Sequence, residues 1–174
     1  MTDVAIRAAT PADIPGITCI YAHAVMHGTA TFELEPPDQA EMARRMTALF
    51  ESGFPYLAAE IRGALVGYAY ANHYRTRPAY RFTVEDSIYI DPQAQRRGVG
   101  RALLAQLIEE CARRGFRQMV AVIGDSAQLA SIEVHRALGF RPVGSFENVG
   151  FKFGRWLDSV MMQRELGPGA KTKP

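Results

Sequence analysis

The chain has 174 residues, a mass of 19.2 kDa, a formal net charge of +2 and a pI near 8.6. Hydrophobic residues make up 48% and charged residues 22%, which is ordinary for a globular domain and excludes a disordered chain, a collagen-like fibre and a coiled coil. Such a small positive charge does not indicate a nucleic-acid partner, and acidic residues are interleaved with the arginines along the chain.

The first fifty residues combine one strand pattern with two helical patterns. Residues 4–8 alternate as a strand does, and Thr10 then stands where a helix cap is expected. Apolar residues recur at helical spacing through 11–26, which predicts a helix with one buried face. A polar, proline-rich stretch follows, and Asp38 is placed to cap a second helix that runs to about Phe50.

The central part of the chain changes to strand patterns. Segments 55–61 and 64–71 flank an Arg-Gly pair at 62–63, which predicts a β-hairpin. A loop over 72–80 leads to a long strand candidate over 82–91, which an Asp-Pro pair ends.

The C-terminal part alternates between helices and strands. An amphipathic helix is predicted over 98–115 and an almost wholly apolar strand over 118–124. A further helix over about 127–138 ends at a Leu-Gly-Phe sequence. Two last strands are expected around 142–148 and 155–164.

This order predicts an α/β domain with a mixed central sheet of about six to seven strands, flanked by about four helices. We expect one domain over 1–166 and a flexible tail over 167–174. The middle of the chain reads strand, loop, helix, strand, helix, an arrangement that places a ligand where strands end and helices begin.

No apolar run approaches the ~20 residues of a membrane-spanning helix, and the N-terminal residues lack the order of a signal peptide. We therefore expect a cytoplasmic protein without a membrane partner. Cys19 and Cys111 both lie in apolar helical patterns and are expected to be reduced core thiols. Three histidines show no spacing with acidic partners that indicates a metal site: His23, His27 and His73.

The loop before the helix at 98–115 is the clearest candidate binding element. Gly98 and Gly100 let the backbone turn tightly and approach a ligand, and the helix start offers free N–H groups and a positive dipole end. Three arginines add positive charge: Arg96, Arg97 and Arg101. The loop fits neither GxxxxGK[ST] nor the GxGxxG of a first βαβ unit, so a P-loop and a dinucleotide site are excluded. A capped helix start with surface arginines is the alternative interpretation.

The spacing Gln95-x-x-Gly98-x-Gly100, directly after the strand SIYI, resembles the acetyl-CoA pyrophosphate loop of the GNAT N-acetyltransferase superfamily. The sequence HRALGF at 135–140 resembles the closing signature of the same superfamily. The two signatures occur in the right order, which makes the combination more specific than either one alone.

Further segments resemble one subfamily, the phosphinothricin and methionine sulfoximine/sulfone acetyltransferases. These segments are TATFELEP at 29–36, YLAAEI with VGYAYA, RTRPAYRFTVEDSIYI at 75–90, VAVIG at 120–124 and KFGRWLD at 152–158. The likeness extends from about Ile6 to Leu166, nearly the whole domain. It implies a GNAT fold, acetyl-CoA as co-substrate, an amino-acid-like acceptor and a homodimer with the last strands near the interface.

Acetyl transfer to an amine requires a base for the ammonium, polarisation of the thioester carbonyl and stabilisation of the leaving thiolate. The resemblance places the catalytic glutamate at Glu85, in a strand that runs towards the cofactor loop. Asp86 is expected on the opposite face of that strand. His135 stands where many superfamily members have a tyrosine that protonates the thiolate. For both Glu85 and His135, a structural role is the alternative.

The resemblance implies a cofactor site along one strand, one loop and one helix start. Its expected members are Ile88, Tyr89, Ile90, Arg96, Arg97, Gly98, Val99, Gly100, Arg101 and Gln128. The backbone of Ile88 and Ile90 would pair with the pantetheine. Gln128 replaces the usual asparagine, which puts that contact in doubt, and Ser126 or Ser131 could substitute for it.

The acceptor is expected to carry a carboxylate, which arginine recognises well. Candidate acceptor residues lie in the loop before the Glu85 strand and after the first helix: Arg75, Thr76, Arg77, Tyr80, Phe32 and Glu33. Arg81 is a weaker candidate, and each of them could instead be a surface side chain. Trp156 is expected at a sheet edge or a subunit contact.

The sequence therefore predicts direct acetyl transfer from acetyl-CoA to the α-amine of a small amino acid or analogue, without a metal and without an acyl-cysteine. An acetyltransferase for polyamines or peptide N-termini is one alternative, although a polyamine site would favour acidic pocket residues. A sensor that binds acetyl-CoA without turnover is the other, although a sensor needs neither Glu85 nor His135.

Overall fold

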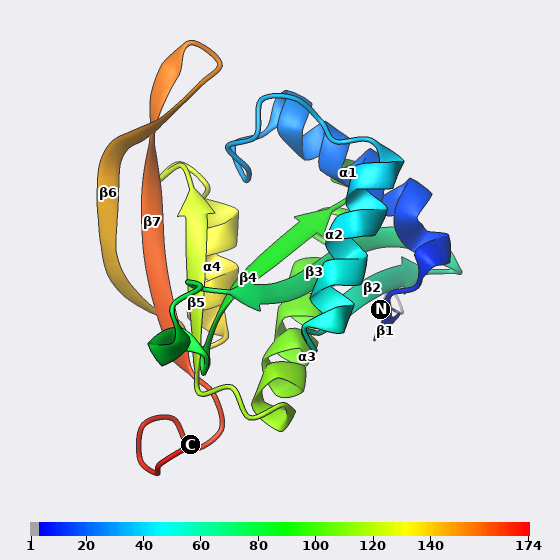
Figure 1. The fold of residues 1–174 in the computed structure, drawn as a ribbon. Helices are drawn as coiled ribbons and strands as arrows, with labels where there is room; N and C mark the ends of the chain where they lie inside the picture. Colours follow the sequence, from blue (N-terminus) through cyan, green and yellow to red (C-terminus); the bar gives the residue numbers. More distant parts are fainter. Residues whose placement is uncertain (1–3) are drawn as a thin grey trace.

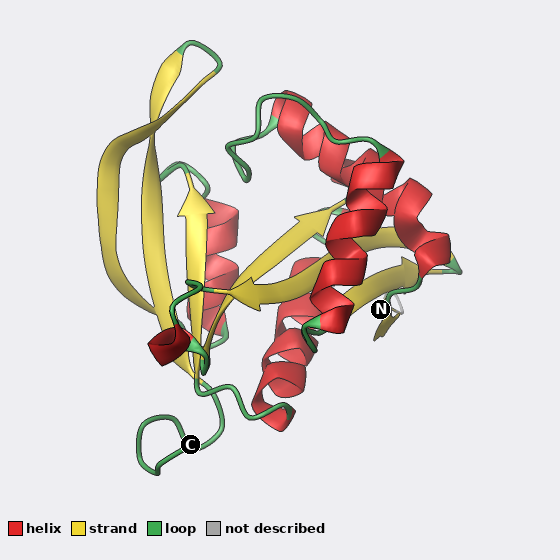
Figure 2. Cartoon of the chain, in the orientation of Figure 1, coloured by secondary structure: helices red, strands yellow, loops and turns green. Residues whose placement is uncertain are grey.

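The protein was analysed as a computed structural model, which describes residues 4–174. Seven strands form one sheet in the order β1-β2-β3-β4-β5-β7-β6. The strands are β1 Val4–Ala8, β2 Tyr56–Ile61, β3 Ala64–His73, β4 Thr83–Ile90, β5 Gln118–Gly124, β6 Arg141–Lys152 and β7 Arg155–Glu165. The helices are α1 Ile14–His27, α2 Gln39–Glu51, α3 Val99–Arg113 and α4 Leu129–Ala137. This arrangement confirms the predicted mixed α/β fold (Figures 1 and 2).

The helices cover the two faces of the sheet. Figure 1 shows α1 and α2 on the near face and α3 and α4 behind the strands. The apolar side of α3 is completely buried at Leu103, Leu104 and Leu107, as its amphipathic pattern predicts. Asp38 caps α2 by accepting a hydrogen bond of 2.8 Å from the backbone N–H of Glu41.

The sheet opens between β4 and β5. These are its two parallel neighbours, and they pair only where Thr83–Asp86 lies beside Gln118–Ala121. Each strand then continues, β4 to Ile90 and β5 to Gly124, and Figure 1 shows them diverging. A sheet that opens in its middle leaves strand edges with backbone groups free to bind a ligand.

The element boundaries agree with the sequence analysis to within three residues except in β6. This strand reaches Lys152, beyond the predicted end at 148, and a two-residue turn joins it to β7. The turn residues Phe153 and Gly154 both have positive φ, at 53° and 73°, as the hairpin turn that matches strand twist requires.

One core prediction is wrong. Cys111 is buried in α3, and burial raises the pKa of its thiol to about 12. Cys19, however, lies on the exposed side of α1 because the apolar stripe of that helix passes through Ile17, Ile20 and Tyr21 instead.

The C-terminal tail folds into turns beside the domain. Leu166 is buried, and the guanidinium of Arg117 donates to Thr172 Oγ1 at 3.1 Å and to the carbonyl of Lys173 at 3.3 Å. The expected division into a domain over 1–166 and a flexible tail over 167–174 stays a prediction.

Candidate active site

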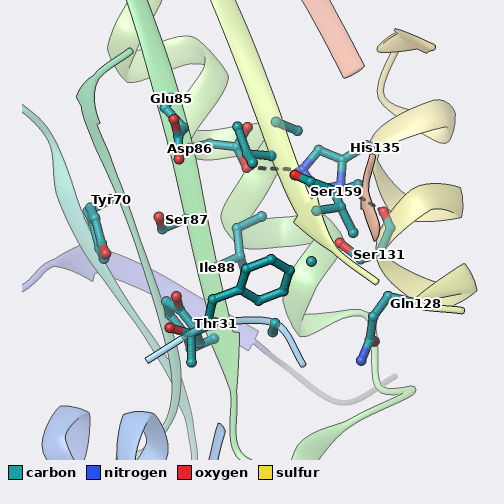
Figure 3. A pocket seen from close by; sticks show the side chains of 17 residues that line it. Thr31, Tyr70, Glu85, Asp86, Ser87, Ile88, Gln128, Ser131, His135 and Ser159 are labelled. Atoms are coloured by element: carbon teal, nitrogen blue, oxygen red, sulfur yellow. Dashed lines mark hydrogen bonds and ion pairs between the residues drawn. The ribbon is translucent and has the colours of Figure 1, made fainter. Parts of the chain in front are cut away.

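A cavity of about 360 Å³ lies where β4 and β5 diverge. Its walls come from β3, β4, β5, β7, α4 and the segment after α1. The lining residues are Ala30, Thr31, Phe32, Tyr70, Glu85, Asp86, Ser87, Ile88, Tyr89, Ala121, Val122, Ile123, Gly124, Gln128, Ser131, His135 and Ser159. Figure 3 shows the polar members of this set. The structure thus brings both predicted catalytic residues, Glu85 and His135, into one cavity.

Glu85 is the carboxyl of this cavity whose pKa is raised to near neutrality. Burial raises the pKa of its carboxyl to about 7, and the charge of the adjacent Asp86 adds to the effect. A carboxylate with a pKa near neutrality can both take and hold a proton at physiological pH, which suits a general base.

Strand alternation separates the two neighbouring carboxylates. Tyr89 contacts Tyr21 of α1, with ring centroids 4.9 Å apart, and Glu85 shares its face of β4. Asp86 points the other way, to α4, as the sequence predicts (Figure 3). Glu85 and Asp86 therefore reach the cavity from different faces of the sheet.

His135 and Asp86 form a buried pair. The imidazole Nε2 lies 3.0 Å from Asp86 Oδ2, and Nδ1 lies 2.7 Å from the carbonyl oxygen of Ser131. Because a carbonyl only accepts, Nδ1 must carry a hydrogen. Burial alone would lower the pKa of His135, but the hydrogen bond and charge of Asp86 outweigh it and raise that pKa.

The segment 28–33 between α1 and α2, here called the strap, forms one wall of the cavity. Gln128 Nε2 donates to Thr29 Oγ1 at 2.9 Å, which joins the strap to the start of α4. The ring of Phe32 lies against two glycines: a Cβ at Gly124 would stand 2.8 Å from Phe32 Cε1, and one at Gly150 would stand 2.7 Å from Phe32 Cδ2. Any side chain at either position would collide with the Phe32 ring, so the ring fits here only because both residues are glycine.

The predicted cofactor loop has the backbone geometry that its glycines indicate. Gly98 precedes α3 with φ 82°, and Arg96 also has a positive φ, at 60°. A β-carbon at Gly98 would meet no atom within 4 Å, so the backbone conformation, and not the space, requires glycine there. Arg96, Arg97 and Arg101 are exposed, and Val99 is buried.

The predicted acceptor residues fall into two groups. Phe32 lines the cavity, and Glu33 lies beside it in the strap, where it accepts hydrogen bonds from Tyr21 at 2.9 Å and Arg45 at 2.7 Å. The others are exposed on the loop between β3 and β4, away from the cavity lining: Arg75, Thr76, Arg77 and Tyr80. In that loop the Arg75 guanidinium lies 5.3 Å from the centroid of the Tyr74 ring.

Comparison with known proteins shows that the chain is similar to acetyltransferases along almost all of its length. The family described as acetyltransferase (GNAT) domain matches residues 6–161. The chain belongs to the GNAT acetyltransferase family. It is 53% identical over 169 residues to the phosphinothricin N-acetyltransferase of Alcaligenes faecalis, covering 97% of this chain and 86% of that protein.

Two further relatives are similar over 94% of their length. The L-methionine sulfoximine/L-methionine sulfone acetyltransferase of Salmonella typhimurium is 42% identical, with 92% of this chain and 94% of that protein covered. The crystal structure of a GNAT superfamily phosphinothricin acetyltransferase from Sinorhizobium meliloti, in complex with AcCoA, superposes with a TM-score of 0.96. It is 51% identical, and the match covers 100% of this chain and 94% of that one. The chain is thus an N-acetyltransferase by family.

The sequence analysis of this GNAT acetyltransferase missed part of the cavity. Tyr70 and Ser87, which face each other across β3 and β4, both line it, as does Ser159 of β7. Pairing two predicted strands by alternation could have found the first two. No local pattern marks Ser159, because its place depends on how β7 pairs with β5.

Two negative findings apply to residues 4–174 of this GNAT acetyltransferase. None of the helices there combines the length and apolar character that crossing a membrane requires. In the same range, no three His, Cys, Asp or Glu side chains gather in a way that could hold a metal ion.

Proposed function

We propose that this GNAT protein transfers an acetyl group from acetyl-CoA to the α-amine of a small amino acid or analogue. The acceptors we expect are of the same class as phosphinothricin, methionine sulfoximine and methionine sulfone, the compounds after which its relatives are named. The observation that carries the proposal is Glu85, a carboxylate with a pKa of about 7 in the cavity where β4 and β5 diverge.

The chain offers a fitting cradle for acetyl-CoA. Beyond Asp86 the edge of β4 turns away from β5, so the backbone of Ile88 and Ile90 is available to pair with the pantetheine arm. The N-terminus of α3 and the backbone from Arg96 to Arg101 would hold the pyrophosphate, with the arginines adding positive charge. Gln128 lines the cavity, with its amide N–H donated to Thr29 and its amide oxygen left to accept from a ligand.

Acetyl-CoA supplies the acetyl thioester, and the residues of the chain supply proton transfer and orientation. Glu85 takes a proton from the acceptor ammonium, directly or through a water, which frees the lone pair for attack. His135 holds a proton on Nδ1 and shares a second with Asp86, which makes the pair a source of a proton for the leaving thiolate. Holding both reactants in one site supplies up to ~7–11 kcal/mol of the barrier reduction.

The loop between β3 and β4 supports an anionic acceptor. Arg75 and Arg77 lie in the loop that leads into the strand of Glu85, outside the lining of the cavity, and their guanidinium groups match carboxylate and phosphinate geometry. A polyamine would need acidic groups in their place.

The first experiment is an assay of CoA thiol release from acetyl-CoA with the purified protein. The acceptors are phosphinothricin, methionine sulfoximine, methionine sulfone, the common amino acids, spermidine and a short peptide. We expect turnover on the amino-acid analogues and little on spermidine. Turnover only on spermidine or the peptide would contradict the acceptor class. Tight acetyl-CoA binding without turnover of any acceptor would favour the sensor interpretation.

We further propose that the protein is a homodimer through β6. This strand lies at the edge of the sheet, where its backbone and side chains are exposed for most of its length. Large apolar side chains there and on the adjoining turn and strand are more than half exposed: Val143, Phe146, Val149, Phe151, Phe153 and Trp156. Exposed apolar groups gathered on an edge strand mark a contact surface. A cytoplasmic location stays a prediction.

Replacing Phe151 by Asp is expected to give a monomer. Phe151 contacts Trp156 across the hairpin, with ring centroids 5.2 Å apart, and a charge there would have to be buried in the interface. Analytical ultracentrifugation should find about twice 19.2 kDa for the wild type and 19.2 kDa for the variant. Met26→Asp, at an equally exposed apolar position on α1, is the control. A monomeric wild type would refute the dimer.

A further inference from the structure

Lys152, at the end of β6, is a lysine with little access to water. It is 3% exposed, although Lys171 and Lys173, the other two lysines of the chain, are exposed in the tail. Burial lowers the pKa of its ammonium, and the charge of Glu33 partly opposes that effect. Removing an ammonium from water is costly unless its hydrogens find acceptors.

Both hydrogen bonds of this ammonium go to the strap. Nζ donates to the carbonyl oxygen of Gly28 and to that of Thr31, each at 2.8 Å, across more than 120 residues of sequence. The two carbonyls lie at the first and fourth residues of the strap, so one side chain holds this short irregular segment at two points.

The strap matters because it carries part of the cavity wall. Ala30, Thr31 and Phe32 line the cavity that holds Glu85. Phe32 reaches its place only because Gly124 of β5 and Gly150 of β6 leave room for the ring. Figure 1 shows the segment after α1 extending towards β5 and the β6–β7 hairpin, which are distant from it in sequence.

We propose that Lys152 is a positioning residue of the acceptor site: it ties the strap to the β6–β7 hairpin and so holds Phe32 as a wall of the cavity. This rests on the proposed function, because the wall shapes an acceptor pocket only if the cavity binds the acceptor. The strap meets the predicted cofactor site at Gln128, which donates to Thr29, whereas the cofactor loop at the start of α3 lies outside these contacts. We therefore expect a larger effect of Lys152 on the acceptor than on acetyl-CoA.

The test compares Lys152→Met, which keeps the length of the side chain but cannot donate, with Lys171→Met as the matched control. We expect the KM for methionine sulfoximine or phosphinothricin to rise by about tenfold or more in Lys152→Met, while kcat and the KM for acetyl-CoA change less than about threefold. Hydrogen exchange of the amides in 28–33 should become faster in this variant, because the strap has lost its two ties.

Gly150→Ala gives a second variant that leaves the ammonium in place. Its β-carbon would displace the Phe32 ring, so the same rise in the acceptor KM is expected with acetyl-CoA binding retained. If Lys152→Met does not fold, an unchanged acceptor KM in Gly150→Ala would show that Phe32 is not a wall of the acceptor pocket, which would overturn the proposal.

Unchanged exchange in the strap and an unchanged acceptor KM in folded Lys152→Met would overturn the proposal. So would an equal loss of affinity for acetyl-CoA and acceptor, because that is the result of general destabilisation. A wild type that turns over no acceptor would refute the proposed function, whereas the exchange comparison would still decide whether Lys152 holds the strap.

Discussion

Replacing Glu85 by Gln is expected to lower kcat by ~10²–10⁴-fold, the usual contribution of a general base. The amide keeps the size of the side chain and its place on β4 but cannot take a proton from the acceptor ammonium. The KM for acetyl-CoA should change little, because the predicted cofactor contacts lie further along β4, in the α3 loop and at Gln128, and none of them is made by the Glu85 side chain. Steady-state kinetics with the preferred acceptor measure this.

The pH dependence gives an independent check on Glu85. The base works in its ionised form, and burial raises the pKa of its carboxyl to about 7. The kcat/KM of the wild type should therefore rise as the pH increases through about 7, and this limb should be absent from Glu85→Gln. Glu109→Gln, at an exposed glutamate of α3, should behave as the wild type. A Glu85→Gln enzyme with wild-type kcat and the same pH limb would show that another group is the base.

The raised pKa of Glu85 also predicts that Glu85→Gln is more stable than the wild type above neutral pH. A carboxyl with a pKa raised from 4.5 to about 7 by folding binds its proton more tightly in the folded state, so its contribution turns unfavourable as the pH rises above 4.5 and is fully unfavourable above about 7. Glu85→Gln should therefore raise the free energy of unfolding at pH 8, by on the order of 1–2 kcal/mol after allowance for partial exposure. The gain should vanish below pH 4.5, and urea unfolding at both pH values measures it.

Local pattern was sufficient for most of the fold. The helical spacing of apolar residues defined α1 and α3, the Asp38 cap indicated α2, and the Arg-Gly turn defined the β2–β3 hairpin, because in each case the signal is local. The end of β6 was missed because its turn begins with Phe153, an unusual residue for positive φ. The exposure of Cys19 was missed because a cysteine inside an apolar run does not reveal on which side of the stripe it lies.

The part of the site that local sequence patterns mark was predictable. Glu85 and His135 stand in recognisable segments, and both reach the cavity. The long-range contacts of the site were not predictable: Asp86 meets His135 across 49 residues, and Lys152 meets Gly28 of the strap across 124 residues. Such contacts depend on the packing of α4 and the β6–β7 hairpin against the rest of the fold, which no short window of sequence contains.

Breaking the buried pair of Asp86 and His135 is expected to destabilise the folded protein strongly. The Asp86 side chain is 3% exposed and that of His135 is 5% exposed. The carbonyl of Ser131 fixes the hydrogen on Nδ1, so Nε2 and Asp86 Oδ2 share one proton between them. Asp86 Oδ1 is buried and has no hydrogen-bond partner within the described residues, so the imidazole is the main support of this carboxylate.

Asp86→Leu should lower the free energy of unfolding by about 3–5 kcal/mol at pH 6, the usual cost of removing one partner from a buried pair. The raised pKa of His135 means that the pair stabilises the folded state below pH 6.5 and loses this part of its effect as the pH rises through the folded-state pKa. The cost of Asp86→Leu should therefore be smaller at pH 9 than at pH 6. Urea unfolding at the two pH values measures the difference.

Asp86→Asn separates charge from packing. The amide can still donate to Nε2 of a neutral imidazole, so the variant should fold, and burial should then hold the pKa of His135 below 6.5. NMR titration reports this directly, because His135 is the buried histidine and His23, His27 and His73 are exposed. The activity of Asp86→Asn gives a second readout. Loss of the Asp86 charge should lower the pKa of Glu85, so the rise of kcat/KM with pH should occur below pH 7 in this variant. An unmoved limb together with an unmoved His135 titration would show that the charge of Asp86 perturbs neither Glu85 nor His135, which would contradict this account of the pair.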